Sequence, residues 1–194
     1  MKASFFERFV AYVVDIVIIG ALCTLVIAII PHQDTTVLKN ELAQLRTQYA
    51  SKEISYEAYS KTAADLYYQI DGVNIPQKTI TIIITMCYFM YYQYRTNGKT
   101  IGKKMMKIRI VKENGDISLN DIVYRSLLVN GVIFSIMAIG IIFISNRGAY
   151  YNSKIIIDGA QLACMFIIGV MVLYRKDKRG IHDLLTNTKV ISER

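Results

Sequence analysis

Apolar residues in this chain form long blocks instead of alternating with polar residues. A helix needs about 20 such residues to cross the hydrocarbon core of a bilayer. Four blocks come near that length: Phe9 to Ile30, about Pro76 to Tyr94, about Ile122 to Ser145, and Ile155 to Tyr174. The pattern predicts an all-α integral membrane protein, with four transmembrane helices in a single domain over residues 1–194.

Residues 31–75, between the first two blocks, are polar and contain two stretches with helical spacing. The apolar residues of VLKNELAQLRTQYA recur every three to four positions, and YEAYSKTAADLYYQI repeats the pattern after the break SKEIS. We expect an antiparallel helical hairpin outside the membrane, inserted into the domain. It is either a spacer that caps the helices or a docking surface for a partner. Its tyrosines favour the docking surface, because tyrosine is enriched at interfaces.

Residues 95–121, between the second and third blocks, contain a strand pattern. In KIRIVKENGDISL the apolar residues Ile108 and Ile110 alternate with basic ones before the dipeptide Asn114-Gly115. An Asn-Gly pair after such alternation is a strong hairpin signal. We predict a small β-hairpin here, to which TKVIS near the C-terminus can add a third strand.

The net charge of +8 is distributed unevenly between the blocks. The segment 95–121 holds seven basic residues and the tail after Tyr174 holds six, whereas 31–75 has four basic residues against six acidic ones. Basic residues mark the cytoplasmic side of a membrane protein. We therefore expect both termini and residues 95–121 in the cytoplasm, with the first block retained as a span. Contact of 95–112 with anionic lipid headgroups accounts for the excess charge, so no nucleic acid is needed as a partner.

Familiar catalytic and cofactor motifs are not matched. The three cysteines lie in three different apolar blocks, which argues against disulfides and a zinc site. The GKT at 98–100 is not a phosphate-binding loop, because Gln93 occupies the position of the required first glycine. His32 and His182 are far apart, and no nucleophile is paired with a base at a justified spacing. We expect no enzyme activity, cofactor or metal.

Two charged residues in the first block raise a specific question. Arg8 and Asp15 are seven residues apart, so they lie on one helix face with Asp15 about 10 Å deeper. A carboxylate at such depth costs about 2.5–3.5 kcal/mol on insertion scales and needs a partner. Arg125 opens the third block at the same depth as Arg8. Asp15 is therefore either a structural link between helices or part of an ion pathway.

Three stretches resemble the RDD family of bacterial membrane proteins. They are FFERFVAYVVDIVII, TNGKTIGKKMMKIRIVKENGDISLNDIVYRSL and KRGIHDLLTNTKVIS, in the same order as in the family. The family name records one arginine and two aspartates, which by position are Arg8, Asp15 and Asp183. The resemblance implies a multi-pass protein of the bacterial cytoplasmic membrane. It also implies a role in transport, with cation/proton exchange proposed for some members, or association with membrane enzymes.

Two functional hypotheses follow. In the first, Asp15 takes up a proton or cation, while Arg8 with Asp183 gates the cytoplasmic mouth near Arg125. Four helices are few for a complete pathway, so this hypothesis predicts a homo-oligomer or a larger complex. In the second, the chain is a non-transporting accessory or regulatory subunit that binds a partner membrane protein through its external hairpin.

Overall fold

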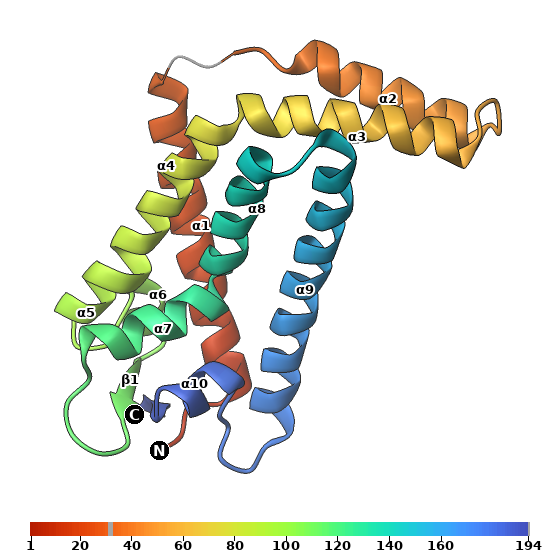
Figure 1. The fold of residues 1–194 in the computed structure, drawn as a ribbon. Coiled ribbons are helices and arrows are strands. Elements are labelled where there is room, and N and C mark those ends of the chain that lie inside the picture. Colours follow the sequence, from red (N-terminus) through yellow and green to blue (C-terminus); the bar gives the residue numbers. More distant parts are fainter. Residues whose placement is uncertain (31–32, 194) are drawn as a thin grey trace.

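The computed structural model describes residues 1–30 and 33–193, so His32 lies outside the described residues. Long helices run roughly side by side, with a helical hairpin across one end and both termini at the other (Figure 1). The elements are α1 (Phe5–Ile29), α2 (Thr36–Ala50), α3 (Tyr56–Val73), α4 (Ile75–Met86), η1 (Cys87–Tyr92), α5 (Gln93–Arg95), α6 (Ile101–Met105), β1 (Ile108–Lys112), α7 (Leu119–Val129), α8 (Val132–Ile144), α9 (Arg147–Tyr174), α10 (Ile181–Leu185) and β2 (Thr188–Ser192).

The helices of the predicted membrane blocks differ in how they would cross a bilayer. Within the described residues, α1 and α9 are each long and apolar enough to span by themselves. The pair α7 and α8 would form a third span, but it is bent by 67°. In the second block α4, η1 and α5 follow one another without a break, with a π-helical turn in η1. Apolar helices of membrane type are thus confirmed, while the number of four spans stays a prediction.

The third predicted block is not one straight helix. Helix α7 ends at Val129 with Asn130 as its C-cap, and Gly131 has a left-handed backbone with a φ of 64°. This conformation is accessible to glycine at little cost and reorients the chain before α8 begins. This bend matters for the site, because it places α7 across the lower end of the bundle beside α10 (Figure 1).

The two helices of 31–75 are present as α2 and α3, hereafter the outer hairpin. They pack against each other through a small cluster of Leu42, Ala63, Leu66 and Ile70. Ser55 caps α3 by accepting a hydrogen bond from the Ala58 amide, which starts the second helix after the break. The hairpin thus has its own apolar contacts, formed by the residues whose spacing predicted it.

A buried carboxylate fastens the outer hairpin to the long helices. Asp71 of α3 accepts a hydrogen bond from Lys78 Nζ of α4 at 2.6 Å and another from the Tyr150 hydroxyl of α9. Burial raises the pKa of Asp71, but the hydrogen bonds from Lys78 and Tyr150 lower it more, so the net shift is downward. Tyr68 adds a bond to the Ile142 carbonyl of α8 at 3.3 Å.

The predicted β-hairpin at Asn114-Gly115 is wrong. Strand β1 pairs instead with β2, antiparallel, with Ile108 opposite Ser192 and Lys112 opposite Thr188. Gly115 does turn the chain, with a φ of 85°, but the turn leads to Ser118, which caps α7 in a capping box with Asp121. No second strand follows this turn, so β1 finds its partner in TKVIS.

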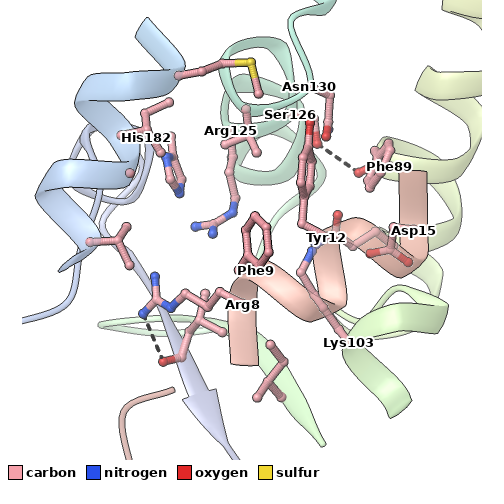
Figure 2. Close-up of a pocket in the computed structure, with 18 of the residues that line it drawn as sticks. Arg8, Phe9, Tyr12, Asp15, Phe89, Lys103, Arg125, Ser126, Asn130 and His182 are labelled. Atoms are coloured by element: carbon pink, nitrogen blue, oxygen red, sulfur yellow. Dashed lines mark hydrogen bonds between the residues drawn. The ribbon is translucent and has the colours of Figure 1, made fainter. Parts of the chain in front are cut away.

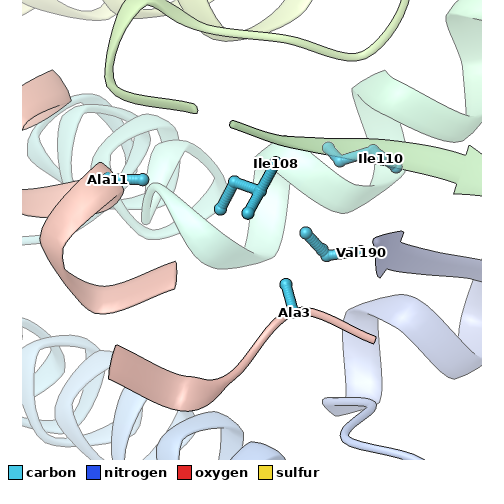
Figure 3. Packing of buried hydrophobic residues seen from close by; sticks show 5 residues of the cluster. All are labelled: Ala3, Ala11, Ile108, Ile110 and Val190. Atoms are coloured by element: carbon cyan, nitrogen blue, oxygen red, sulfur yellow. The ribbon is translucent and has the colours of Figure 1, made fainter. Parts of the chain in front are cut away.

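Burial of apolar residues explains this pairing. Ile108, Ile110 and Val190 on the strands form one cluster with Ala3 and Ala11 at the start of the chain (Figure 3). The Ala3 amide donates to the Val190 carbonyl at 3.1 Å, immediately before Ser4 caps α1. The sheet therefore fixes where α1 begins, and with it the position of Arg8.

Candidate functional site

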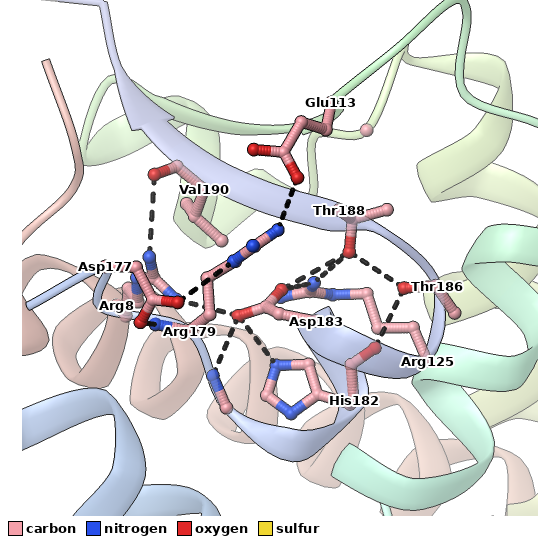
Figure 4. Close-up of polar contacts among 12 residues, drawn as sticks. Arg8, Glu113, Arg125, Asp177, Arg179, His182, Asp183, Thr186, Thr188 and Val190 are labelled. Atoms are coloured by element: carbon pink, nitrogen blue, oxygen red, sulfur yellow. Dashed lines mark hydrogen bonds and ion pairs between the residues drawn. The ribbon is translucent and has the colours of Figure 1, made fainter. Parts of the chain in front are cut away.

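Asp183 lies at the centre of a buried ion cluster beneath the helices. Its carboxylate is fully buried and interacts with Arg8 Nη1 of α1 at 3.1 Å and with Arg125 Nη1 of α7. Thr188 Oγ1 of β2 donates to it at 3.3 Å, and the Gly180 amide at 3.2 Å (Figure 4). The carboxylate thus ties α1, α7, α10 and β2 together.

Electrostatics keep this carboxylate ionised. Burial raises the pKa of Asp183, but the positive charge of Arg125, the contact with His182 and the charge of Arg8 hold it well below its usual range. Burial and the charge of Arg125 lower the pKa of His182 to about 4, so its imidazole is neutral at pH 7. Asp183 therefore balances part of the charge of two arginines, and His182 adds none.

Asp15 is in a different environment from Asp183. It is 1% exposed and accepts hydrogen bonds from the Tyr88 hydroxyl at 2.7 Å, the Gly102 amide at 2.8 Å and the Thr100 hydroxyl. The last two groups belong to the start of α6, which the carboxylate caps from another helix. Asp15 is thus held by neutral donors that fasten α6 to α1.

The backbone at Gly102 permits this contact. A Cβ atom there would lie 2.1 Å from the Ala11 carbonyl oxygen and 2.9 Å from Asp15 Oδ1. Such a distance to backbone atoms is not tolerated, so only glycine lets α6 approach α1 closely enough. The Gly-Lys-Lys run of the sequence is therefore a contact point between helices.

A cavity of about 350 Å³ lies between these two clusters. Its lining residues come from α1, η1, α5, α6, β1, α7, α9 and the C-terminal segment, and most of the lining is apolar. Arg8, Arg125 and Lys103 project toward it from three elements, with His182 at one side (Figure 2). A mostly apolar cavity with a few convergent polar groups is the usual form of a small-ligand site.

Lys103 also lines this cavity, although it is not among the candidate site residues predicted from the sequence. Its Nζ donates to Gln93 Oε1 at 3.0 Å, in the amide orientation in which Gln93 Nε2 also donates to the Phe89 carbonyl at 2.9 Å. Burial and the charge of Arg125 lower the pKa of Lys103 to about 7, although Asp15 raises it. Sequence pattern alone does not distinguish Lys103 from its neighbours, because it stands in a run of loop lysines.

The four predicted site residues thus divide into two groups. Arg8, Arg125 and Asp183 meet in one ion cluster, whereas Asp15 bonds to Tyr88, Thr100 and Gly102. Among residues 1–30 and 33–193, no group of three or more His, Cys, Asp or Glu side chains is placed to hold a metal ion.

A family model for the RDD family matches residues 2–187, nearly the whole chain. The chain belongs to the RDD family. Comparisons with curated proteins and with solved structures found no match. Arg8 and Asp183, which the resemblance assigns to the arginine and the second aspartate of the family name, form a direct ion pair at the start of α1. Asp15, which the resemblance assigns to the first aspartate, holds α6 through the Gly102 amide.

We predict that Gly102→Ala lowers the free energy of unfolding by about 1–3 kcal/mol, because the added methyl group overpacks the contact with Ala11. Thermal unfolding of the protein in detergent measures the change. Gly20→Ala in the middle of α1 is the matched control, since nothing lies within 4 Å of a Cβ there. Equal stability of both variants would show that α6 does not depend on the close approach.

We predict that Asp183→Asn lowers the free energy of unfolding by about 3–5 kcal/mol, because two buried guanidinium groups lose their counter-charge. Asp177→Asn, which removes a more exposed partner of Arg175, should cost less than about 1 kcal/mol. Because the folded-state pKa of Asp183 is depressed, its contribution is present above about pH 4 and is lost as the pH falls further. Acid unfolding of the wild type should show this loss, and the variant should not.

Proposed function

We propose that this RDD protein is a multi-pass protein of the bacterial cytoplasmic membrane, with both termini in the cytoplasm, that takes part in proton-linked transport of an anionic solute. The observation that supports the proposal is the cavity beside Arg8, Lys103 and Arg125. It lies at the end of the helices nearest both termini, and its charged groups are enclosed by apolar walls.

The charges at the cavity favour an anion. Arg8, Arg125 and protonated Lys103 bring three positive charges, against two negative charges from Asp15 and Asp183. With a neutral His182, the sum is one positive charge, and it becomes zero when Lys103 loses its proton. One proton on Lys103 and one monoanion therefore balance each other, which is the requirement for moving the two together.

Cation/proton exchange at Asp15 is less well supported by the geometry. A cation at that carboxylate would have to displace the donors Tyr88, Thr100 and Gly102, and Arg125 and Lys103 would repel it. In our proposal Lys103 takes up the proton, Asp15 is structural, and the Arg8–Asp183 pair closes the cytoplasmic end. Because the chain has few helices, we propose that it acts as a homo-oligomer or with a membrane protein partner.

One observation favours the accessory function as a second candidate. The turn of the outer hairpin carries three contacting tyrosines, with ring centroids 4.7 Å apart for Tyr49 and Tyr59 and 6.2 Å for Tyr49 and Tyr56. Tyr56 is 66% exposed. Exposed aromatic groups are enriched in protein interfaces, so this tip suits the docking of a partner membrane protein.

We predict that an inward gradient of dimethyl phosphate, a permanent monoanion, acidifies the lumen of vesicles that contain the wild-type protein. Lys103→Met should reduce the rate to that of empty vesicles, because the proton carrier is lost. A pH-sensitive dye inside the vesicles measures the change. Lys104→Met is the matched control, since Lys104 is exposed and bonds to the Tyr92 hydroxyl.

Sodium and potassium gradients across the same vesicles test the alternative, cation/proton exchange at Asp15. If they drive proton movement that Asp15→Asn abolishes and Lys103→Met leaves intact, the site exchanges cations and our assignment of the proton to Lys103 is wrong. Elution of each variant as a folded species in size-exclusion chromatography is the condition for comparing rates.

For the accessory function we predict that Tyr56→Ser releases a partner that co-purifies stoichiometrically with the wild type, without a change in thermal stability. The exposed position of Tyr56 predicts this separation of binding from folding. Lys61→Ser on the same helix is the control. Absence of a stoichiometric partner from gentle purification of the wild type would reject this candidate.

A further inference from the structure

We propose that the cavity binds an amphiphile with a monoanionic oxyanion head, a phosphodiester or a carboxylate, whose hydrocarbon tail leaves between α1 and α9. This inference rests on the proposed function in one respect: it takes the cavity as a binding site and names the class of molecule that binds there. It needs no transport, so the two proposals can fail separately.

Unused hydrogen-bond donors at the polar end of the cavity favour an oxyanion. Arg8 Nε is buried and, within the described part of the chain, has no hydrogen-bond partner. Among the described residues, the side chain of Arg125 makes two hydrogen bonds, both from Nη1, and its guanidinium points into the cavity (Figure 2). Arginine N–H groups form their strongest hydrogen bonds with carboxylate and phosphate oxygens. An oxyanion head would provide the missing acceptors.

The size of the cavity suits a head rather than a complete lipid. Small-ligand sites range from about 300 to 1,000 Å³, and about 350 Å³ is at the lower end. A phosphodiester or carboxylate with its first carbons fits this space, but two acyl chains do not. The tail must therefore extend beyond the cavity.

Apolar groups mark where the tail would leave. The cavity wall includes Phe9 on α1, which is 53% exposed, and Met165 on α9, which is 38% exposed. Ile168 and Val172 continue the apolar wall along α9. Both helices are long and apolar enough to span a membrane, so this edge faces hydrocarbon. A tail that leaves here stays in the bilayer, whereas a purely polar anion would have to pass the apolar edge.

The charge of Lys103 makes the binding dependent on pH. The charged and titratable groups near it are Arg8, Tyr12 and Asp15 on α1, Tyr88 on η1, Arg125 on α7, and His182 and Asp183 on α10. With these neighbours, Lys103 loses its proton near pH 7 in the empty site. A bound anion favours the protonated amine, so the affinity should be highest below pH 7 and fall as the pH rises through it.

Thermal shift and native mass spectrometry of the purified protein in maltoside detergent test this inference. The probes are phosphatidylglycerol, phosphatidylcholine of the same chain length, palmitate, dimethyl phosphate and inorganic phosphate. We expect binding of phosphatidylglycerol or palmitate, whichever head the site prefers, with about tenfold weaker binding at pH 8 than at pH 6. Phosphatidylcholine and inorganic phosphate should bind at least tenfold more weakly than the preferred amphiphile.

Variants test whether the cavity is responsible. Lys103→Met should weaken binding about tenfold at pH 6 and remove the pH dependence, whereas Lys103→Arg should keep the affinity at pH 8. Asn130→Asp places a negative charge on the cavity wall without changing the size of the side chain, and it should weaken binding at both pH values. Lys104→Met removes the same charge from the exposed side of α6 and should change nothing.

Four results would overturn the inference. Equal binding of inorganic phosphate would leave no role for the tail, and equal binding of phosphatidylcholine would leave none for the negative charge. Equal effects of Lys103→Met and Lys104→Met would assign the binding to surface charge. Amphiphile binding without dimethyl phosphate flux would reject the proposed transport alone, and flux without amphiphile binding would reject this inference alone.

Discussion

The carboxylate of Asp183 is the group on which the lower half of the molecule depends. It is fully buried between two arginines that come from α1 and α7. Neither arginine would be stable there without it, because an unpaired buried charge costs several kcal/mol. The short helix α10 and strand β2 are held at the same point. One ion cluster therefore sets how the first helix, the third predicted span and the C-terminal segment meet.

The buried carboxylate of Asp15 is stabilised by neutral hydrogen-bond donors instead of cations. A carboxylate inside a membrane helix needs partners, and here they are a tyrosine hydroxyl, a threonine hydroxyl and a backbone amide. This arrangement fixes α6 and turns Lys103 toward the cavity. The two aspartates thus hold opposite walls of one cavity, and the titratable group between them is a lysine.

The different roles of Asp15 and Lys103 change which residue is the first candidate for a function in this RDD protein. An intramembrane acid is by default a candidate for ion binding, and Asp15 would be the obvious target. The cavity beside it, however, presents mainly cationic donors and apolar walls. The anionic occupant that we propose would balance this charge. The outer hairpin, which Asp71 fastens to α4 and α9, lies at the opposite end of the bundle.

The sequence by itself determined the apolar helices, the outer hairpin and the RDD relationship, because these depend on local spacing and on the order of short motifs. It also predicted that Arg8, Arg125 and Asp183 lie at the same depth relative to the membrane, since the ends of the apolar blocks and the distribution of basic residues determine that depth. Tertiary structure alone decided that β1 pairs with β2, that Gly131 bends the third block and that Lys103 faces inward. Each of these depends on contacts between residues far apart in the chain. The alternation around Ile108 does not specify which strand pairs with β1, and the lysine run does not specify which lysine faces inward. Packing of these segments against α1 decides both.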